Sequence, residues 1–402
     1  MTETLHEAAR PDDIAILLPG GGARAAYQVG ALCAIARILA RDRHSPFRIV
    51  CGTSAGAINA ATLALHADSF RRGVARLLRW WRALEVEMVY RADLASVAAH
   101  GMRWLASVLV GASGPKQAAS MLNNAPLRAL LQKHLDLDRV AAQIATGNLL
   151  ALAINATSYT TGHAVTFFQG SPSLLPWRRT RRRGEAAMIT IDHLLASTAI
   201  PFVFPAARLG DDYFADGSVR QITPLSPALH LGARRILVIA VGQFSGQRPT
   251  GAQLAEPRYP SFAQMAGHAL SSIFLDNLGA DLERLAQMNR VVGLLSPLRL
   301  SRNGLALAHV DAMVLAPSRD IGPLALEYAE RLPAGVRTLL RGFGSTRGTG
   351  ANLVSYLLFD RGFCRALLAL GYADAMARRD ELAAFLDEAQ ARFLPVFLAD
   401  GR

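Results

Sequence analysis

Ser54 is the residue of this chain whose surroundings are best suited to chemistry. It stands at the centre of Gly-Thr-Ser-Ala-Gly (residues 52–56), at the end of the strand expected over 47–53 and before a helix-forming segment. At a strand-to-helix turn this pattern exposes the serine oxygen at the top of a sheet, as in a nucleophile elbow. Gly52 and Gly56 suit so tight a turn, because it brings backbone segments closer than a Cβ allows. The pattern favours a nucleophilic serine over a serine that merely caps a helix or is buried in a turn.

A second glycine-rich turn, Gly20-Gly21-Gly22-Ala23-Arg24, follows the apolar run 14–18 and opens a helix pattern. Consecutive glycines let backbone N–H groups converge on an anion, and a helix N-terminus favours negative charge. The turn is therefore suited to an oxyanion hole, which stabilises the charged intermediate of ester hydrolysis. Arg24 would either add positive charge near the site or pair on the surface.

A dinucleotide site is the competing interpretation of the same turn, because Gly20, Gly22 and Ala25 match Gly-x-Gly-x-x-(Gly/Ala). That site requires an acid at the end of the next strand, where it would bind a ribose hydroxyl. Asp42 has a suitable distance in sequence but precedes that strand. The nucleotide interpretation therefore fails on geometry.

Ser54 needs a base to accept its proton, and the sequence offers two kinds. A triad would add an acid and then a histidine after the serine, but none of the ten histidines follows a suitable acid in a strand-end loop. His309 is the least implausible of them. Asp216 ends a turn and short strand (209–218) in Asp-Gly, and could hydrogen-bond the serine hydroxyl directly. A carboxylate is a weak base unless its site raises its pKa, and a plain Asp-Gly turn is the alternative.

Four segments together resemble the patatin-like phospholipase family, whose members are serine lipid acyl hydrolases with a Ser–Asp dyad. They are the turn at Gly20–Arg24, the motif around Ser54, the stretch Ala-Ser-Thr-Ala-Ile-Pro-Phe-Val-Phe-Pro (196–205) and Asp216-Gly217. Their order and spacing agree with the family over about residues 13–245.

The resemblance implies a role for each matching residue. Ser54 would be the nucleophile and Asp216 the base, with no metal or cofactor, and Gly20, Gly21, Gly22 and Arg24 would serve the oxyanion hole. The substrate would be a phospholipid or related lipid ester, cleaved through an acyl-enzyme. Two positions depart from the family pattern, Ala25 and Ser218, and both residues are small enough to preserve the backbone. The alternatives are an acyltransferase with the same dyad, a Ser-His-Asp α/β-hydrolase, and a catalytically weak lipid-binding protein.

The elements that must position these residues alternate between strand and helix patterns. With 51% apolar and 18% charged residues in a chain of 402, a folded protein with a large core is expected. The alternation predicts a mainly parallel α/β sheet with helices on both faces, and the resemblance implies a three-layer α/β/α fold. We expect a flexible N-terminus (1–12), a catalytic domain (13–245) and a mostly helical C-terminal region (246–402) packed on it. The expected strands are 14–18, 47–53, 149–156, 164–169 and 235–241, and the expected helices are 23–40, 55–84, 262–292 and two or three within 353–394.

Compartment and membrane contact are predicted from apolar runs and cysteines. No segment reaches the roughly 18 uninterrupted apolar residues of a spanning helix, and 94–110 is typical of a core or interfacial helix. Cys33, Cys51 and Cys364 are widely spaced in apolar surroundings, as expected of reduced thiols, and not of disulfides or a zinc site. We expect a cytoplasmic protein, peripheral on the inner membrane surface at most.

The net charge of +12 is carried almost entirely by arginine, because only Lys116 and Lys133 are lysines. The run Trp177–Arg183 is the densest cationic segment and could hold anionic headgroups or phosphates, or be a solvated loop. No nucleic-acid module accompanies it, so nucleic acid is not expected as a partner. The oligomeric state is not indicated.

Overall fold

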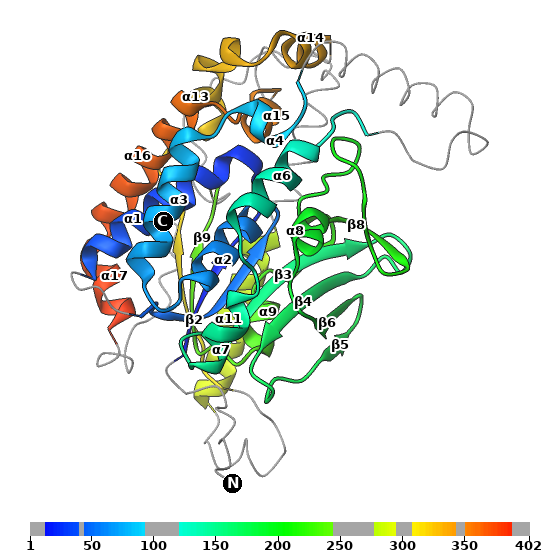
Figure 1. Cartoon of the computed structure of the whole chain (residues 1–402). Coiled ribbons are helices and arrows are strands. Elements are labelled where there is room, and N and C mark those ends of the chain that lie inside the picture. Colours follow the sequence, from blue (N-terminus) through cyan, green and yellow to red (C-terminus); the bar gives the residue numbers. More distant parts are fainter. Residues whose placement is uncertain are drawn as a thin grey trace.

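The computed structural model describes residues 13–39, 44–92, 120–243, 277–294, 308–342 and 350–387 (Figure 1). In this part of the chain ten strands form one sheet, in the order β10-β9-β1-β2-β3-β4-β6-β5, with β8 paired to β3 and β7 to β8. Neighbouring strands run parallel from β10 to β3, and β4 and β8 run antiparallel to β3. The strands are β1 (Ile14–Leu18), β2 (Phe47–Thr53), β3 (Ala151–Ser158), β4 (Ala164–Gly170), β5 (Trp177–Arg179), β6 (Arg182–Ala186), β7 (Ala207–Leu209), β8 (Asp212–Asp216), β9 (Arg235–Ile239) and β10 (Asp311–Leu315).

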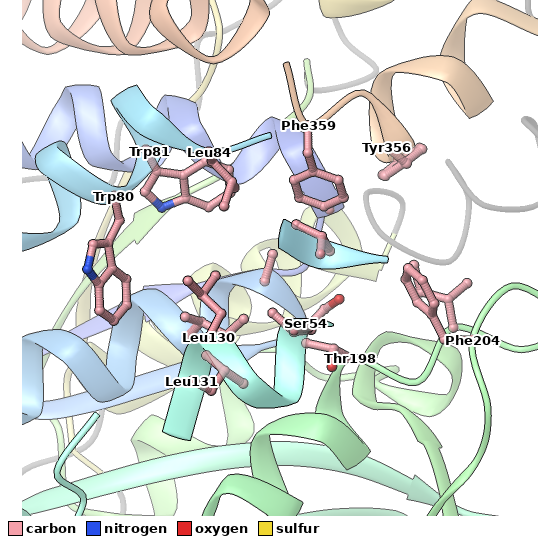
Figure 2. A pocket seen from close by; sticks show the side chains of 16 residues that line it. Ser54, Trp80, Trp81, Leu84, Leu130, Leu131, Thr198, Phe204, Tyr356 and Phe359 are labelled. Atoms are coloured by element: carbon pink, nitrogen blue, oxygen red, sulfur yellow. The ribbon is translucent and has the colours of Figure 1, made fainter. Parts of the chain in front are cut away.

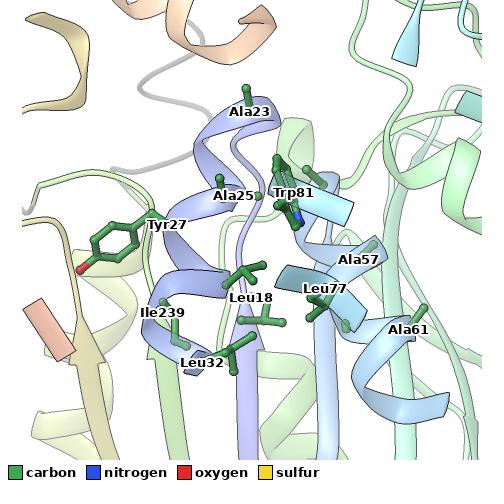
Figure 3. Packing of buried hydrophobic residues seen from close by; sticks show 14 of the residues in the cluster. Leu18, Ala23, Ala25, Tyr27, Leu32, Ala57, Ala61, Leu77, Trp81 and Ile239 are labelled. Atoms are coloured by element: carbon green, nitrogen blue, oxygen red, sulfur yellow. The ribbon is translucent and has the colours of Figure 1, made fainter. Parts of the chain in front are cut away.

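Helices cover both faces of this sheet, because successive side chains of a strand point to opposite sides. One face packs with α1, α2, α3 and α16, and the other with α9 and α11. Figure 3 shows Leu18 of β1 beneath the small residues Ala25 and Ala57 on the first face. The helices are α1 (Ala26–Ile38), α2 (Ala55–Leu65), α3 (Phe70–Ala83), α4 (Val86–Val89), α6 (Ala125–His134), α7 (Arg139–Ala145), α8 (Ile191–Ser197), α9 (Ser226–His230), α11 (Asn277–Leu294), α13 (Ile321–Glu327), α14 (Ala334–Gly342), α15 (Gly350–Leu357), α16 (Arg361–Ala377) and α17 (Arg379–Leu386), with short 3₁₀ turns η1 (Gly22–Ala25), η3 (Gly217–Arg220) and η5 (Ala329–Arg331).

The predicted fold class is confirmed: a mostly parallel sheet lies between layers of helices. The strands expected at 14–18 and 47–53 have those bounds, and the helix expected over 23–40 is divided into η1 and α1. The arginine run Trp177–Arg183 is not a solvated loop, which was one of its expected forms. It forms the β5–β6 hairpin, in which Trp177 is buried by stacking on Phe168 and His230.

The C-terminal part of the described chain shares the core of the rest. β10 extends the sheet beside β9, and α16 packs against α1. Glycines allow this close approach, since a Cβ on Gly30 would lie 2.1 Å from the Leu368 carbonyl oxygen, and one on Gly371 would lie 2.1 Å from that of Tyr27. The division of the chain near residue 245 stays a prediction.

Other expectations concern membrane-spanning helices, metal sites and the cysteines. No helix among them is long and apolar enough to cross a membrane, and no cluster of His, Cys, Asp and Glu in them could hold a metal ion. Cys51 and Cys364 are buried free thiols, and burial raises the pKa of each to about 12. The expected segments 1–12 and 94–110, and Asp42, lie outside the described residues.

Candidate active site

Ser54 occupies the turn between β2 and α2 in a strained conformation. Its φ of 55° and ψ of −131° lie in a region that residues with side chains rarely adopt. The turn is held by close backbone contacts, because a Cβ on Gly56 would lie 2.1 Å from the Leu18 carbonyl oxygen. Only glycine fits there, so the second glycine of the motif is required by packing. The elbow predicted from the sequence is the geometry observed.

Ser197 holds the backbone of this turn from the side of α8. The Ser54 N–H donates to Ser197 Oγ at 2.8 Å, and Ser197 Oγ donates to the Asn155 carbonyl oxygen at 2.6 Å. Ser197 is completely buried, so the two hydrogen bonds are shielded from water. The sequence placed Ser197 within a family segment but assigned it no such contact.

Asp216 ends β8, beside β3 in the antiparallel part of the sheet. Its backbone N–H donates to the Ala199 carbonyl oxygen at 2.8 Å, and Oδ1 accepts from the Ser218 N–H at 2.9 Å. The next residue must be glycine, since a Cβ on Gly217 would lie 2.3 Å from the Asn155 carbonyl oxygen. The Asp-Gly pair therefore lies against β3, the neighbour of the strand that ends at Ser54.

The Asp216 carboxyl group is a stronger base than an ordinary aspartate. Its side chain is fully buried, and burial raises its pKa to about 6, although hydrogen bonds from Ser54 and Ser218 oppose the shift. Among the described residues it forms no ion pair, and Oδ2 is buried without a well-aligned donor. Oδ2 is thus left to interact with the nearby Ser54 hydroxyl. A carboxylate with a pKa near 6 is suited to proton transfer at neutral pH.

The glycine turn lies beside Ser54 because β1 and β2 are parallel neighbours, with Leu18 opposite Gly52. Gly22 has a φ of +54°, and a Cβ there would lie 2.2 Å from the Tyr356 carbonyl oxygen. Gly22 lines the same cavity as Ser54. Gly20 and Gly21 are buried between β1 and η1. The structure thus brings the two predicted glycine turns together at one edge of the sheet.

Arg24 does not pair on the surface, which was one of its two expected arrangements. It is 2% exposed, its Nε donates to Ser355 Oγ at 2.7 Å, and its guanidinium lies 4.4 Å from the centre of the Tyr356 ring. Its side chain does not line the cavity beside Ser54. Arg24 therefore joins the glycine turn to α15.

An apolar cavity of about 60 Å³ opens beside Ser54 (Figure 2). Besides α2 and the segment after α8, its walls include Trp80 and Trp81 of α3, the leucines of α6, and residues at the end of α15. The sequence did not indicate α6 as part of the site, although leucines at 127, 130 and 131 have helical spacing. Nor did it indicate Tyr356 and Phe359, which lie more than 300 residues after Ser54 in sequence. An apolar recess beside a nucleophile is suited to an acyl chain.

His309 is not close to Ser54. It is an exposed residue before β10 whose Nε2 lies 3.0 Å from Asp311 Oδ1. Asp311, Arg235 and Ile14 are aligned at the start of their parallel strands, whereas Ser54 follows the end of β2. A strand of this length separates the two ends by about 20 Å. No histidine of the described residues lines the cavity beside Ser54, so the geometry opposes the triad alternative.

Comparison with known proteins gives a family and several structural neighbours. A family model described as patatin-like phospholipase matches residues 16–229, a range that includes Ser54 and Asp216. The solved structure of VipD from Legionella pneumophila is similar over 93% of this chain and 68% of that one, at 12% identity and a TM-score of 0.34. A comparison with curated proteins gives no match.

Proposed function

Since the chain belongs to the patatin-like phospholipase family, we propose that it is a phospholipase A-type esterase in which Ser54 is the nucleophile and Asp216 the base. Family membership by itself makes it a lipid acyl hydrolase in general terms. The observation that carries the finer proposal is the Asp216 carboxyl group, which is fully buried and has its pKa raised to about 6 beside the Ser54 hydroxyl.

The geometry supports acylation of Ser54 through a tetrahedral intermediate, with Asp216 transferring the proton. The Ser54 Oγ attacks the ester carbonyl while Asp216 Oδ2 accepts its proton. Backbone N–H groups of the turn at Gly20–Gly22, together with the N-terminus of α2, stabilise the oxyanion that forms. Arg24 contributes by fixing this turn against Ser355 and Tyr356. The protonated Asp216 then gives the proton to the leaving alcohol.

The acyl-enzyme is hydrolysed by the same two groups. Asp216, again ionised, removes a proton from water, and the resulting nucleophile attacks the acyl carbonyl. Ser54 recovers its proton as the fatty acid leaves. The acyl chain lies meanwhile in the apolar cavity between α3 and α6. That cavity is small beside the roughly 300–1,000 Å³ of typical ligand pockets, so long chains require its side chains to move.

A panel of lipid esters, assayed with wild type and Ser54→Ala, tests the proposed activity. We expect wild type to release fatty acid from phospholipids or acylglycerols, and Ser54→Ala to release none above background. Labelling of wild type, but not of Ser54→Ala, by a fluorophosphonate would show that the serine is reactive. A protein that binds lipid without turnover would be neither labelled nor active.

The activity should depend on pH through Asp216. The base must be ionised, and burial raises its pKa to about 6, so kcat/KM should fall below that pH and level off above it. The expected slope on the acidic side is about tenfold per pH unit. Initial rates on a neutral ester across this range provide the measurement. A profile that is flat down to about pH 4 would contradict the assignment, since it would require an ordinary carboxylate.

Peripheral contact with an anionic membrane belongs to the same proposal. Arg179 of β5 is exposed, and Leu175, four residues before it, is 76% exposed. Cationic and apolar groups together favour the surface of a bilayer with anionic lipids. The double variant Leu175→Ser, Arg179→Gln should therefore bind vesicles that contain phosphatidylglycerol more weakly than wild type, and unchanged binding would contradict this contact.

A further inference from the structure

A second cavity lies on the other face of the sheet from Ser54. Its volume is about 390 Å³, larger than that of the cavity beside Ser54. It is bounded by the β5–β6 hairpin, the turn at Gly217, and the helices α9 and α11, which pack on that face (Figure 1). The proposed catalytic residues do not line it.

Five arginines line this cavity, and four of them have no ion pair with any of the described residues. Arg183 Nε lies 2.6 Å from Glu185 Oε1, so its charge is balanced. Among the described residues no carboxylate lies within ion-pair distance of the other four, and no acid lines the cavity. Among the described residues, Asp281 interacts electrostatically with Arg284 and Arg182, and its buried carboxylate accepts the Leu225 N–H at 2.9 Å. The five lining arginines are Arg181, Arg182, Arg183, Arg220 and Arg284.

Two buried donors in the wall of the cavity have no acceptor within the part of the chain that the structure describes. Arg182 Nη1 donates to Thr223 Oγ1, but its Nε is buried without a partner. Gln221 accepts from Thr53 Oγ1 at 2.9 Å through Oε1, while its Nε2 is buried without a partner. A buried donor that makes no hydrogen bond destabilises a fold, and so native proteins seldom keep one without a reason. Both donors, and the cationic lining, are suited to an anion.

We propose that this cavity binds a small anion that carries phosphate groups. The guanidinium fork matches phosphate oxygens with paired hydrogen bonds, and several unpaired arginines match more than one phosphate. The Trp177 ring is already buried against Phe168 and His230, so it offers no face on which a base could stack. The chemistry therefore points to a small phosphate or diphosphate group and not to a nucleobase.

The ligand would be distinct from the ester substrate, because the sheet separates the two cavities. Ile58 and Trp81 beside Ser54 belong to the α2 and α3 face, whereas Trp177 belongs to the α9 and α11 face. Gly217, in the turn after Asp216, forms part of the arginine-lined wall.

Calorimetric titration of the full chain with inorganic pyrophosphate tests the proposal without any need for catalysis. We expect saturable binding that weakens as salt is added, because salt screens charge. Arg182→Gln and Arg284→Gln should each weaken binding about tenfold or more. Arg178→Gln is the matched control, since it removes the same charge from the same hairpin outside the cavity. It should change affinity less than about twofold.

Vesicles distinguish a free phosphate from a lipid headgroup with the same chemistry. The Ser54→Ala protein, which should leave lipids intact, is mixed with phosphatidylcholine vesicles with and without phosphatidic acid. Binding to phosphatidic acid that is lost in Arg182→Gln but kept in Arg178→Gln would support a headgroup in the cavity. The opposite pattern would mean that the exposed hairpin contacts the membrane and, without pyrophosphate binding, would overturn the proposal.

Absence of binding to both pyrophosphate and phosphatidic acid would also overturn it. The proposal would also be wrong if Arg182→Gln and Arg284→Gln left pyrophosphate binding unchanged, or if Arg178→Gln weakened it as much as they do. Thermal unfolding of each variant shows whether it is folded. The two proposals are tested separately. A lack of pyrophosphate binding would not contradict the esterase proposal, because the titration does not measure catalysis. A lack of ester hydrolysis by wild type would likewise not contradict the proposed anion site.

Discussion

Asp216→Asn should lower kcat/KM on a chromogenic ester by about 10²–10⁴-fold, the range typical of removing a general base. The amide keeps the shape of the carboxyl group and can still accept the Ser218 N–H, but it cannot take a proton from Ser54. Because an asparagine before Gly217 can deamidate back to aspartate, Asp216→Ala is the companion variant. Both should lose activity to the same degree within the error of the assay.

Asp216→Asn should not lower the stability of the fold at neutral pH. The folded-state pKa of Asp216, about 6, lies above its usual value of 3.8. The folded protein therefore prefers the protonated acid, and stability decreases as pH rises from near 4 through about 6. Asparagine has no such titration. Melting temperatures at pH 7.5 should be equal or higher for Asp216→Asn than for wild type, with the difference smaller near pH 4.

His309→Ala provides the decisive comparison for the dyad. His309 is exposed at the far end of the strands, and its substitution should leave ester hydrolysis within about twofold of wild type. If Asp216→Asn and Asp216→Ala kept full activity while His309→Ala lost it, the dyad would be wrong. An inactive Asp216→Asn that also melts far below wild type would show unfolding and would contradict the predicted stability.

Gly22→Ala should lower ester hydrolysis by about 10²–10³-fold, the loss typical of removing one oxyanion donor. The added Cβ would lie 2.2 Å from the Tyr356 carbonyl oxygen, and backbone atoms cannot yield as a flexible side chain does. The turn must therefore shift, which moves its N–H groups away from the oxyanion. Initial rates on the chromogenic ester provide the measurement.

Gly210→Ala is the matched control for Gly22→Ala. Gly210 has a similar φ of +60°, but a Cβ there meets nothing within 4 Å, so the two variants share backbone strain and differ in the collision. Gly210→Ala should keep nearly full activity. Equal losses of activity in the two variants would mean that backbone strain, and not the collision, causes the effect. A fully active Gly22→Ala would mean that this turn is not part of the oxyanion hole. Fluorophosphonate labelling of Ser54 in Gly22→Ala should be slower, because that reaction uses the same hole.

The fold class and the two glycine turns could be predicted because their signals are local. Apolar runs of five and seven residues, each followed by glycines and a helix pattern, define β1 and β2 and the turns after them. Their parallel pairing then brings Gly22 close to Ser54. The short strand before Asp216 was predicted in the same way, and the family match includes all of these segments. The pairing of Ser54 with Asp216 in catalysis stays a prediction.

Burial and long-range contact could not be predicted, because they depend on residues distant in the chain. The raised pKa of Asp216 follows from its complete desolvation, which no local pattern specifies. The positions of Arg24 beneath Tyr356, and of α6 against α3, were likewise undetermined by spacing. The arginine run was foreseen as a cationic segment. Packing of Trp177 places Arg181, Arg182 and Arg183 at a cavity on the face opposite Ser54.

The local pattern of the chain was therefore sufficient for the backbone that carries the chemistry, since strand, turn and glycine requirements act between near neighbours. Tertiary packing set the environment of that chemistry: how strong a base Asp216 is, what lines the acyl cavity, and which arginines gather on the opposite face of the sheet. These properties arise from desolvation and from contacts between segments hundreds of residues apart, such as Gly22 with Tyr356.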